Sequence, residues 1–154
     1  MGDYTKLNQQ TTPDQFPIPN LFDAANELHG SQVFSKIDLV RAYFNIPVAK
    51  EDIKKTAVIS SARLFEFLHM PLGLHNAPSS FARFIHQVLG DLPFVFPYID
   101  DLLIFSHNLS EHYDHPLTVF QRLDKFKLTL NLETCEFCVP KLDFLGHTIS
   151  KEGF

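Results

Sequence analysis

Residues 94–105 read Phe94-Val95-Phe96-Pro97-Tyr98-Ile99-Asp100-Asp101-Leu102-Leu103-Ile104-Phe105. Two apolar, β-prone runs flank an adjacent pair of aspartates, which is the composition of a tight hairpin with carboxylates at its tip. Neighbouring like charges repel each other and contribute nothing to a core. Two interpretations of the pair remain open at this point: a solvated hairpin turn and a functional site.

A third carboxylate favours the functional interpretation. Residues 33–39 alternate apolar and polar side chains, which predicts a strand with Asp38 on the face opposite Ile37. If this strand lies beside the hairpin, Asp38, Asp100 and Asp101 meet at one face of a sheet. Three carboxylates there can hold two hard cations such as Mg²⁺, and a pair of such ions is suited to phosphoryl transfer. These aspartates are the candidate catalytic residues and metal ligands.

The remaining chain predicts short helices and strands in mixed order. Apolar spacing predicts a helix at 78–89, with Gly90 just past its end, and another at 110–125. In the second helix, Pro116 predicts either a kink or a helix that begins near the proline. A shorter helix is expected at 21–28. Further strand-like runs are 56–59, 64–68, 128–130, 137–139 and 144–149.

This order of elements lacks strict β-α-β alternation. It therefore predicts an α+β fold in which an antiparallel sheet has helices packed on one face. The length of 154 residues, with 45% hydrophobic and 20% charged residues, is enough for one sizeable core.

Composition also bounds the function. The net charge of −5 opposes the basic footprint of a free-standing nucleic-acid binder, so weak affinity for nucleic acid is expected from this chain alone. No apolar run approaches the roughly 18 residues of a membrane span, and the first residues lack the apolar core of a signal peptide. We therefore expect a soluble, intracellular protein without a membrane partner. Cys135 and Cys138 lack a second ligand pair for zinc and are interpreted as two semi-buried thiols.

Four motifs occur in the order and spacing of a reverse transcriptase. They are Phe34-Ser35-Lys36-Ile37-Asp38-Leu39, Met70-Pro71-Leu72-Gly73-Leu74 with Asn76-Ala77-Pro78, Tyr98-Ile99-Asp100-Asp101, and Phe144-Leu145-Gly146-His147. The set most resembles the Pol polyprotein of gypsy-class long-terminal-repeat retrotransposons. The resemblance covers nearly the whole chain.

This resemblance implies a fold and a domain organisation. The fold would be the right-hand polymerase palm plus partial fingers, within one partial reverse transcriptase domain at 1–154. Fingers segments would lie at about 1–30 and 47–72, and the palm at about 31–46 and 73–154. The thumb, ribonuclease H and integrase domains are expected to be absent, so the chain is interpreted as a truncated copy.

The resemblance also implies an activity, that of an RNA-directed DNA polymerase. Asp38, Asp100 and Asp101 would be the catalytic residues and would bind two Mg²⁺ ions, for which Mn²⁺ may substitute. The substrates would be an RNA or DNA template-primer and deoxynucleoside triphosphates. The thumb and ribonuclease H domains of the parent polyprotein would be partners, and an active element would place the chain in a cytoplasmic particle.

Further positions match family segments that contact substrate. Tyr43 matches the aromatic residue that stacks under the incoming sugar and excludes a 2′-hydroxyl; without the resemblance it would be interpreted as a core tyrosine at a strand edge. The nucleotide-binding residues implied are Tyr43, Leu72, Gly73 and Tyr98. The primer grip implied is Phe144, Leu145 and Gly146.

The chain also departs from the family pattern. Thr134 stands where the family has a lysine that, as a proton donor to pyrophosphate, would accelerate the reaction roughly 10²–10⁴-fold. The other departures are Thr5, Ala62-Arg63, Pro97, Pro116 and Lys127. They favour an alternative, a catalytically inactive retroelement relic that keeps the palm fold. A phosphodiesterase or nuclease using the same carboxylates is chemically feasible, but the chain shows no closely spaced additional ligands for it.

Overall fold

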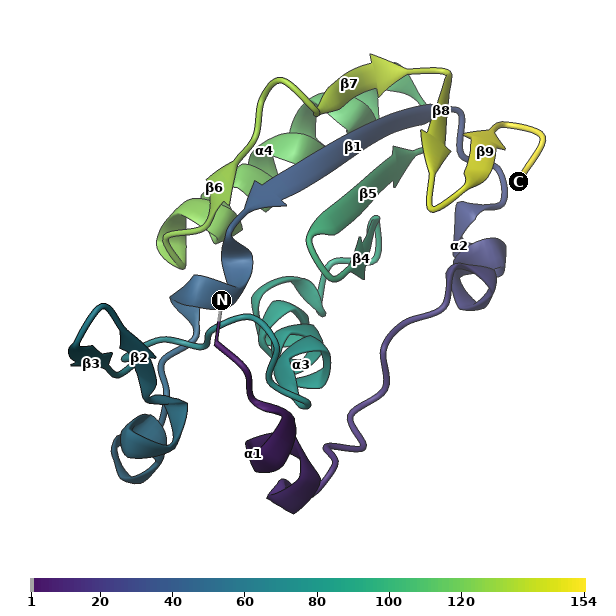
Figure 1. Ribbon diagram of the computed structural model, residues 1–154. Helices are drawn as coiled ribbons and strands as arrows, with labels where there is room; N and C mark the ends of the chain where they lie inside the picture. The colour runs from purple at the N-terminus through teal and green to yellow at the C-terminus, as the bar shows by residue number, and fades with distance from the viewer. Residues whose placement is uncertain (1) are drawn as a thin grey trace.

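The computed structural model describes residues 2–154 and has an antiparallel sheet at its centre (Figure 1). The strand order is β4-β5-β1-β6, with β7 also paired to β1. All of these pairs are antiparallel, as expected. The five strands are β1 (Val33–Val40), β4 (Val95–Tyr98), β5 (Asp101–Ser106), β6 (Thr129–Leu130) and β7 (Glu136–Val139).

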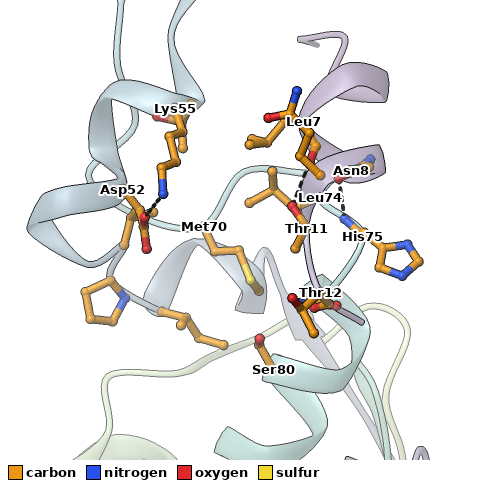
Figure 2. A pocket seen from close by; sticks show the side chains of 16 residues that line it. Leu7, Asn8, Thr11, Thr12, Asp52, Lys55, Met70, Leu74, His75 and Ser80 are labelled. Atoms are coloured by element: carbon orange, nitrogen blue, oxygen red, sulfur yellow. Dashed lines mark hydrogen bonds and ion pairs between the residues drawn. The ribbon is translucent and has the colours of Figure 1, made fainter. Parts of the chain in front are cut away.

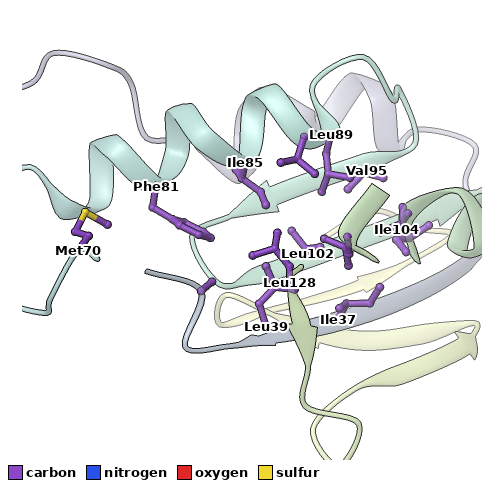
Figure 3. Close-up of a cluster of buried hydrophobic side chains, with 14 of the residues drawn as sticks. Ile37, Leu39, Met70, Phe81, Ile85, Leu89, Val95, Leu102, Ile104 and Leu128 are labelled. Carbon is purple, nitrogen blue, oxygen red and sulfur yellow. The ribbon is translucent and has the colours of Figure 1, made fainter. Parts of the chain in front are cut away.

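Two long helices cover one face of the sheet. They are α3 (Ala77–Leu89), with Pro78 in its first turn, and α4 (Leu109–Lys125). Phe81 and Ile85 of α3 pack with Ile37, Leu102 and Ile104 of the sheet in the larger buried cluster, as Figure 3 shows. This arrangement confirms the predicted α+β fold with helices on a sheet face.

A second buried cluster lies on the opposite face. Its sheet residues include Phe34, which alternates with Ile37 along β1 and therefore points to the other side. The cover comes from short elements: η1 (Leu21–Ala24), α2 (Ala25–Leu28), β8 (Lys141–Phe144) and β9 (His147–Ser150). Asp38 and Asp101 lie farther along this same face, where they are only half-buried. Along this face of the sheet, the buried apolar residues are therefore followed by the two carboxylates.

The remaining elements, which include the N-terminal helix, are short and lie outside the central sheet. The strand-like runs expected at 56–59 and 64–68 form a hairpin, and its turn is Ser61-Ala62 with φ of 43° and 72°. Both residues adopt the left-handed conformation that glycine or asparagine usually supplies. These elements are α1 (Thr5–Gln10), η2 (Ala42–Asn45), η3 (Lys50–Thr56), β2 (Val58–Ser60) and β3 (Arg63–Phe65).

Two expectations need correction. Helix α4 begins at Leu109, where the Asn108 side chain accepts a hydrogen bond from the Glu111 N–H, so a helix beginning near Pro116 is wrong. The Asn108 cap stabilises the first turn, and the helix continues through Pro116, whose side chain is buried. The run 144–149 is not one strand, because β8 ends at Phe144 and the chain reverses through two residues with positive φ.

Pro97 is less disruptive than its sequence context indicates. Strand β4 is at the edge of the sheet, and the Phe105 N–H donates to the Phe94 carbonyl at 3.0 Å. Antiparallel strands alternate between positions that bond to the partner and positions that point away. Counting from Phe94, position 97 points away from β5, so the proline removes no hydrogen bond between β4 and β5.

No helix within residues 2–154 is long and apolar enough to cross a membrane.

Candidate active site

The β4–β5 hairpin brings the three aspartates to one place. Its turn contains Ile99, with φ of 51°, and Asp100, and Asp101 is the first residue of β5. Asp38 of β1 is the direct cross-strand partner of Asp101. The Leu39 N–H donates to the Asp100 carbonyl at 2.8 Å, which fixes the turn against β1. The two motifs, about sixty residues apart, are therefore joined by ordinary antiparallel pairing.

The pKa values of Asp100 and Asp101 are both raised above the usual value for an aspartate. Burial raises the pKa of Asp100, and the charges of Asp101 and Asp38 raise it further. Burial and the charge of Asp38 raise the pKa of Asp101, while Lys36 opposes the effect. Desolvation and repulsion therefore disfavour the charged forms of Asp100 and Asp101. Such perturbed carboxylates are typical of functional sites.

The donor set fits a hard cation. The Asp100 Oδ1 atom is buried and has no hydrogen-bond partner among residues 2–154, although buried polar atoms are nearly always paired. A cation would satisfy this oxygen and relieve the repulsion around it. In the part of the chain that the structure describes, no three Asp, Glu, His or Cys side chains are already gathered as a metal site. Bringing the three carboxylates onto one ion would therefore require side-chain adjustment.

Asp38 is held by a loop, residues 131–135, whose contacts with it the sequence did not predict. The Thr134 hydroxyl donates to Asp38 Oδ2 at 2.6 Å, and the Asn131 N–H donates to the Asp38 carbonyl at 2.8 Å. The Asp38 N–H donates to the sulfur of Cys135 at 3.4 Å. Both cysteines are free, with Cys135 half-buried and Cys138 exposed. Only the pairing of β6 and β7 with β1 brings this loop to the site, so local sequence carried no signal for it.

Two tyrosines lie beside the carboxylates. Tyr43 of η2 is half-buried, and its ring meets Phe81 edge-on with centroids 5.2 Å apart. Burial raises the Tyr43 pKa, and the charges of Asp100 and Tyr98 add to this. Tyr98 is the last residue of β4 and pairs with Asp101. The structure therefore places both predicted nucleotide-binding tyrosines next to the aspartates.

Leu72 and Gly73 lie in the loop before α3. Leu72 is 44% exposed, and Gly73 has a φ of 94° that favours glycine. The Asn8 side chain clamps this loop: its Nδ2 donates to the Gly73 carbonyl at 2.9 Å, and its Oδ1 accepts from the His75 N–H at 2.7 Å. Asn76, just before α3, bonds back to the N-terminal segment. Its Nδ2 donates to the Thr12 carbonyl, and its Oδ1 accepts from the Asp14 N–H. The positioning role of the two asparagines was not predicted.

This clamp borders a cavity of about 560 Å³ between α1, η3 and the start of α3 (Figure 2). Its lining combines apolar side chains, among them Leu7, Met70 and Leu74, with polar ones such as Thr11 and Ser80. An ion pair between Lys55 and Asp52, 2.6 Å apart, lies at its edge. None of the three aspartates lines the cavity, so it is separate from the carboxylate site.

The predicted primer-grip residues divide into two kinds. Phe144 is fully buried and meets Phe96 edge-on, whereas Leu145 and Gly146 form the turn between β8 and β9 with φ of 51° and 78°. Figure 1 shows this hairpin near the beginning of β1, away from the strand end that carries Asp38. Phe144 therefore packs the hairpin onto the sheet, and the turn is the part that can meet a ligand.

Comparison with known proteins agrees with this arrangement. The family model described as reverse transcriptase (RNA-dependent DNA polymerase) matches residues 1–149. The retrovirus-related Pol polyprotein from transposon 297 of Drosophila melanogaster is 39% identical over 153 residues, which is 98% of this chain and 14% of that protein. The transposon Tf2-3 polyprotein of Schizosaccharomyces pombe is 38% identical over 154 residues, 99% of this chain and 12% of that protein.

Solved structures share the fold. The foamy viral protease-reverse transcriptase in complex with an RNA/DNA hybrid superposes with a TM-score of 0.88 at 22% identity, covering 97% of this chain and 20% of that one. A second form of that protein, in complex with double-stranded DNA, gives a TM-score of 0.89 at 22% identity over 97% of this chain and 26% of its own.

Proposed function

The chain belongs to the reverse transcriptase family, and we propose that it forms the catalytic centre of an RNA-directed DNA polymerase within a retrotransposon Pol polyprotein. The family match confirms the resemblance drawn from the four motifs. The chain spans 14% and 12% of the two polyproteins, so the activity of a whole protein of that kind is part of the proposal. The observation that carries it is the cross-strand pairing of Asp38 with Asp101, beside the unpartnered oxygen of Asp100.

The proposed reaction is nucleotidyl transfer. The primer 3′-oxygen forms a bond to the α-phosphorus of a deoxynucleoside triphosphate, the bond to the bridging oxygen breaks, and pyrophosphate leaves. Asp38, Asp100 and Asp101 would hold two Mg²⁺ ions, for which Mn²⁺ would substitute. When bound, such ions lower the pKa of the attacking hydroxyl and neutralise charge on the leaving phosphates. Oxygen ligands of this kind suit both cations.

Other residues would orient the substrates. Tyr43, held edge-on by Phe81 and close to Asp100, is placed to stack under the incoming sugar and exclude a 2′-hydroxyl. Leu72 and Gly73, with Tyr98, would contact the nucleotide and the template. The Leu145-Gly146 turn, packed onto the sheet through Phe144, would contact the primer.

The proposed substrates follow from the family and the fold. The foamy viral enzyme of similar fold is bound to an RNA/DNA hybrid and to double-stranded DNA. An RNA or DNA template-primer is therefore the proposed ligand here. Because the chain's net charge is −5, much of the phosphate binding would come from thumb and ribonuclease H domains of a larger polyprotein.

We also propose the division into fingers at about 1–30 and 47–72, and palm at about 31–46 and 73–154. The β2–β3 hairpin of the fingers leaves Ile59 81% exposed and Leu64 63% exposed. Apolar side chains exposed to this degree side by side are typical of a surface that contacts another part of a protein.

A second candidate is a non-enzymatic relic that keeps the palm fold. Thr134 favours it, because a hydroxyl bonded to Asp38 stands where the family has a proton-donating lysine. The two candidates differ in activity but not in fold.

Primer extension on poly(A)/oligo(dT) with Mg²⁺ or Mn²⁺ separates them. The purified chain is compared with Asp100→Asn and with Asp114→Asn, an exposed aspartate of α4. Incorporation by the chain and by the Asp114 variant, abolished in the Asp100 variant, supports the polymerase. A folded chain that incorporates nothing overturns polymerase activity of the 154-residue chain by itself, and an Asp100 variant as active as the unmodified chain overturns the assignment of the catalytic centre.

A further inference from the structure

A single loop, residues 131–135, binds both the main chain and the side chain of Asp38. The Asn131 N–H reaches the Asp38 carbonyl, the Asp38 N–H reaches the Cys135 sulfur, and the Thr134 hydroxyl reaches Asp38 Oδ2. The last of these is the shortest, at 2.6 Å, and joins residues 96 positions apart. One candidate metal ligand is therefore oriented by a distant segment.

The position of Thr134 follows from strand pairing. Strand β6 pairs with β1 at Leu39 and Val40, and the loop leaves β6 immediately beside Asp38. The Thr134 N–H donates to the Asn131 carbonyl at 3.2 Å, which closes a turn that points the threonine back toward β1. The hydroxyl lies 3.2 Å from the Asn131 carbonyl but 2.6 Å from the carboxylate, so the charge-assisted bond is the shorter one.

We propose that Thr134 is a positioning residue for divalent-cation binding at Asp38. By holding Oδ2, its hydroxyl keeps the carboxylate in one orientation and leaves the other oxygen, Oδ1, for the cation. This inference rests on the proposed function, since it assigns Asp38 as a ligand. Hydrogen bonds to ligating carboxylates orient them, and their loss typically weakens metal binding 10–100-fold.

A neutral hydroxyl suits this role in a crowded site. Asp38 stands opposite Asp101, and the repulsion between the two carboxylates would otherwise turn them apart. Threonine restrains Asp38 without adding positive charge beside it. Thr134 therefore lacks the proton-donating ability of a lysine but can still orient the carboxylate.

Mn²⁺ binding to the 154-residue chain tests the proposal without requiring polymerisation. Free Mn²⁺ is measured by electron paramagnetic resonance during titration of the chain and of Thr134→Val, Thr134→Ser and Asp38→Asn. The matched control is Thr148→Val, which removes a similar bond of 2.9 Å from threonine to Asp143 in the β8–β9 hairpin. Thermal unfolding of every variant is recorded under the same conditions.

We expect Thr134→Val to weaken Mn²⁺ binding about 10-fold, with the unfolding temperature unchanged because the side chain is exposed. Thr134→Ser and Thr148→Val should bind as the unmodified chain does. Normal binding by Thr134→Val, with binding lost in Asp38→Asn, overturns the role of Thr134 and leaves the metal site standing. Equal losses in Thr134→Ser and Thr134→Val also overturn it, because the hydroxyl would then be irrelevant. Absent binding, or binding unaffected by Asp38→Asn, overturns the metal site itself.

Discussion

Asp38 of β1 and Asp101 of β5 are direct cross-strand partners at the centre of an antiparallel sheet. Like charges placed directly opposite each other destabilise a sheet. Burial and the charge of Asp38 accordingly raise the Asp101 pKa. The pairing adds repulsion to the sheet, and the metal ions of the proposed function would neutralise both groups.

The first prediction is that Asp101→Asn stabilises the protein at neutral pH. A carboxyl whose pKa is raised on folding contributes stability below its unfolded pKa of about 3.8, and this contribution is lost as the pH rises through the raised value. The variant should therefore unfold a few degrees higher than the unmodified chain at pH 7, where 1 kcal/mol corresponds to roughly 2–4 °C. The difference should shrink toward pH 4. Thermal unfolding without divalent ions measures it, and Asp114→Asn is the control; a variant less stable at pH 7 contradicts the prediction.

The second prediction concerns Tyr43. Its ring is held edge-on by Phe81 beside Asp100, so removing the ring should open the space next to the sugar. Tyr43→Val should lower the preference for deoxynucleotides over ribonucleotides roughly 10–100-fold, while Tyr43→Phe should keep it. Single-nucleotide incorporation with dTTP and UTP measures the ratio of kcat/KM. An unchanged ratio in Tyr43→Val would show that another residue selects the sugar.

The third prediction concerns a buried polar network beneath β1 and β5. The His112 ring bonds to the Ser35 hydroxyl at 2.6 Å and to the Ser106 hydroxyl at 2.7 Å, and all three residues are buried. His112→Phe should lower the free energy of unfolding by about 1–3 kcal/mol, because both hydroxyls lose a buried partner. The Ser106 hydroxyl keeps its bond to His115, and the Ser35 hydroxyl still accepts from the Cys138 N–H. Chemical denaturation at pH 8 measures this loss, and His29→Gln, at an exposed position, should have little effect.

The same network predicts a pH dependence. Burial, with a smaller effect of His115, lowers the His112 pKa from its usual 6.5. A histidine with a lowered pKa contributes stability above about pH 6.5, and this contribution is lost as the pH falls through the lowered value. Stability should therefore fall below pH 6.5, and the fall should be shallower in His112→Phe. Identical slopes in the two proteins would assign the acid sensitivity to other groups.

The fourth prediction concerns the residue that follows α4. Lys127 has a φ of 60°, a conformation that costs a residue with a side chain roughly 1–2 kcal/mol. Lys127→Gly should stabilise the protein by about 0.5–1 kcal/mol after the entropy of glycine is subtracted. Lys125→Gly, at the last residue of α4, should instead destabilise it by about 0.5 kcal/mol, because the glycine penalty is smaller at a helix end than in its interior. Denaturant unfolding of the pair tests this; equal effects would mean that position 127 is not strained.

Local elements were predicted where their signals were local. Helix α3 has an apolar stripe, a proline in its first turn and Gly90 after its end, and the hairpin of β4 and β5 has apolar runs on both sides of Asp100-Asp101. The prediction for the start of α4 failed because two local signals, a proline and a helix cap, pointed to different residues. Pro116 indicated a helix start, but the Asn108 cap stabilises a first turn that begins at Leu109.

The sequence by itself determined the family, the hairpin that carries Asp100 and Asp101, and the face of β1 that carries Asp38. Alternation and turn chemistry are properties of neighbouring residues, so they can be recognised without a structure. Only the tertiary structure decided which distant groups meet. The bond from Thr134 to Asp38 and the clamp of Asn8 on Gly73 join residues 96 and 65 positions apart. Such contacts depend on strand register and on packing of the whole chain, which no periodicity in a short window records.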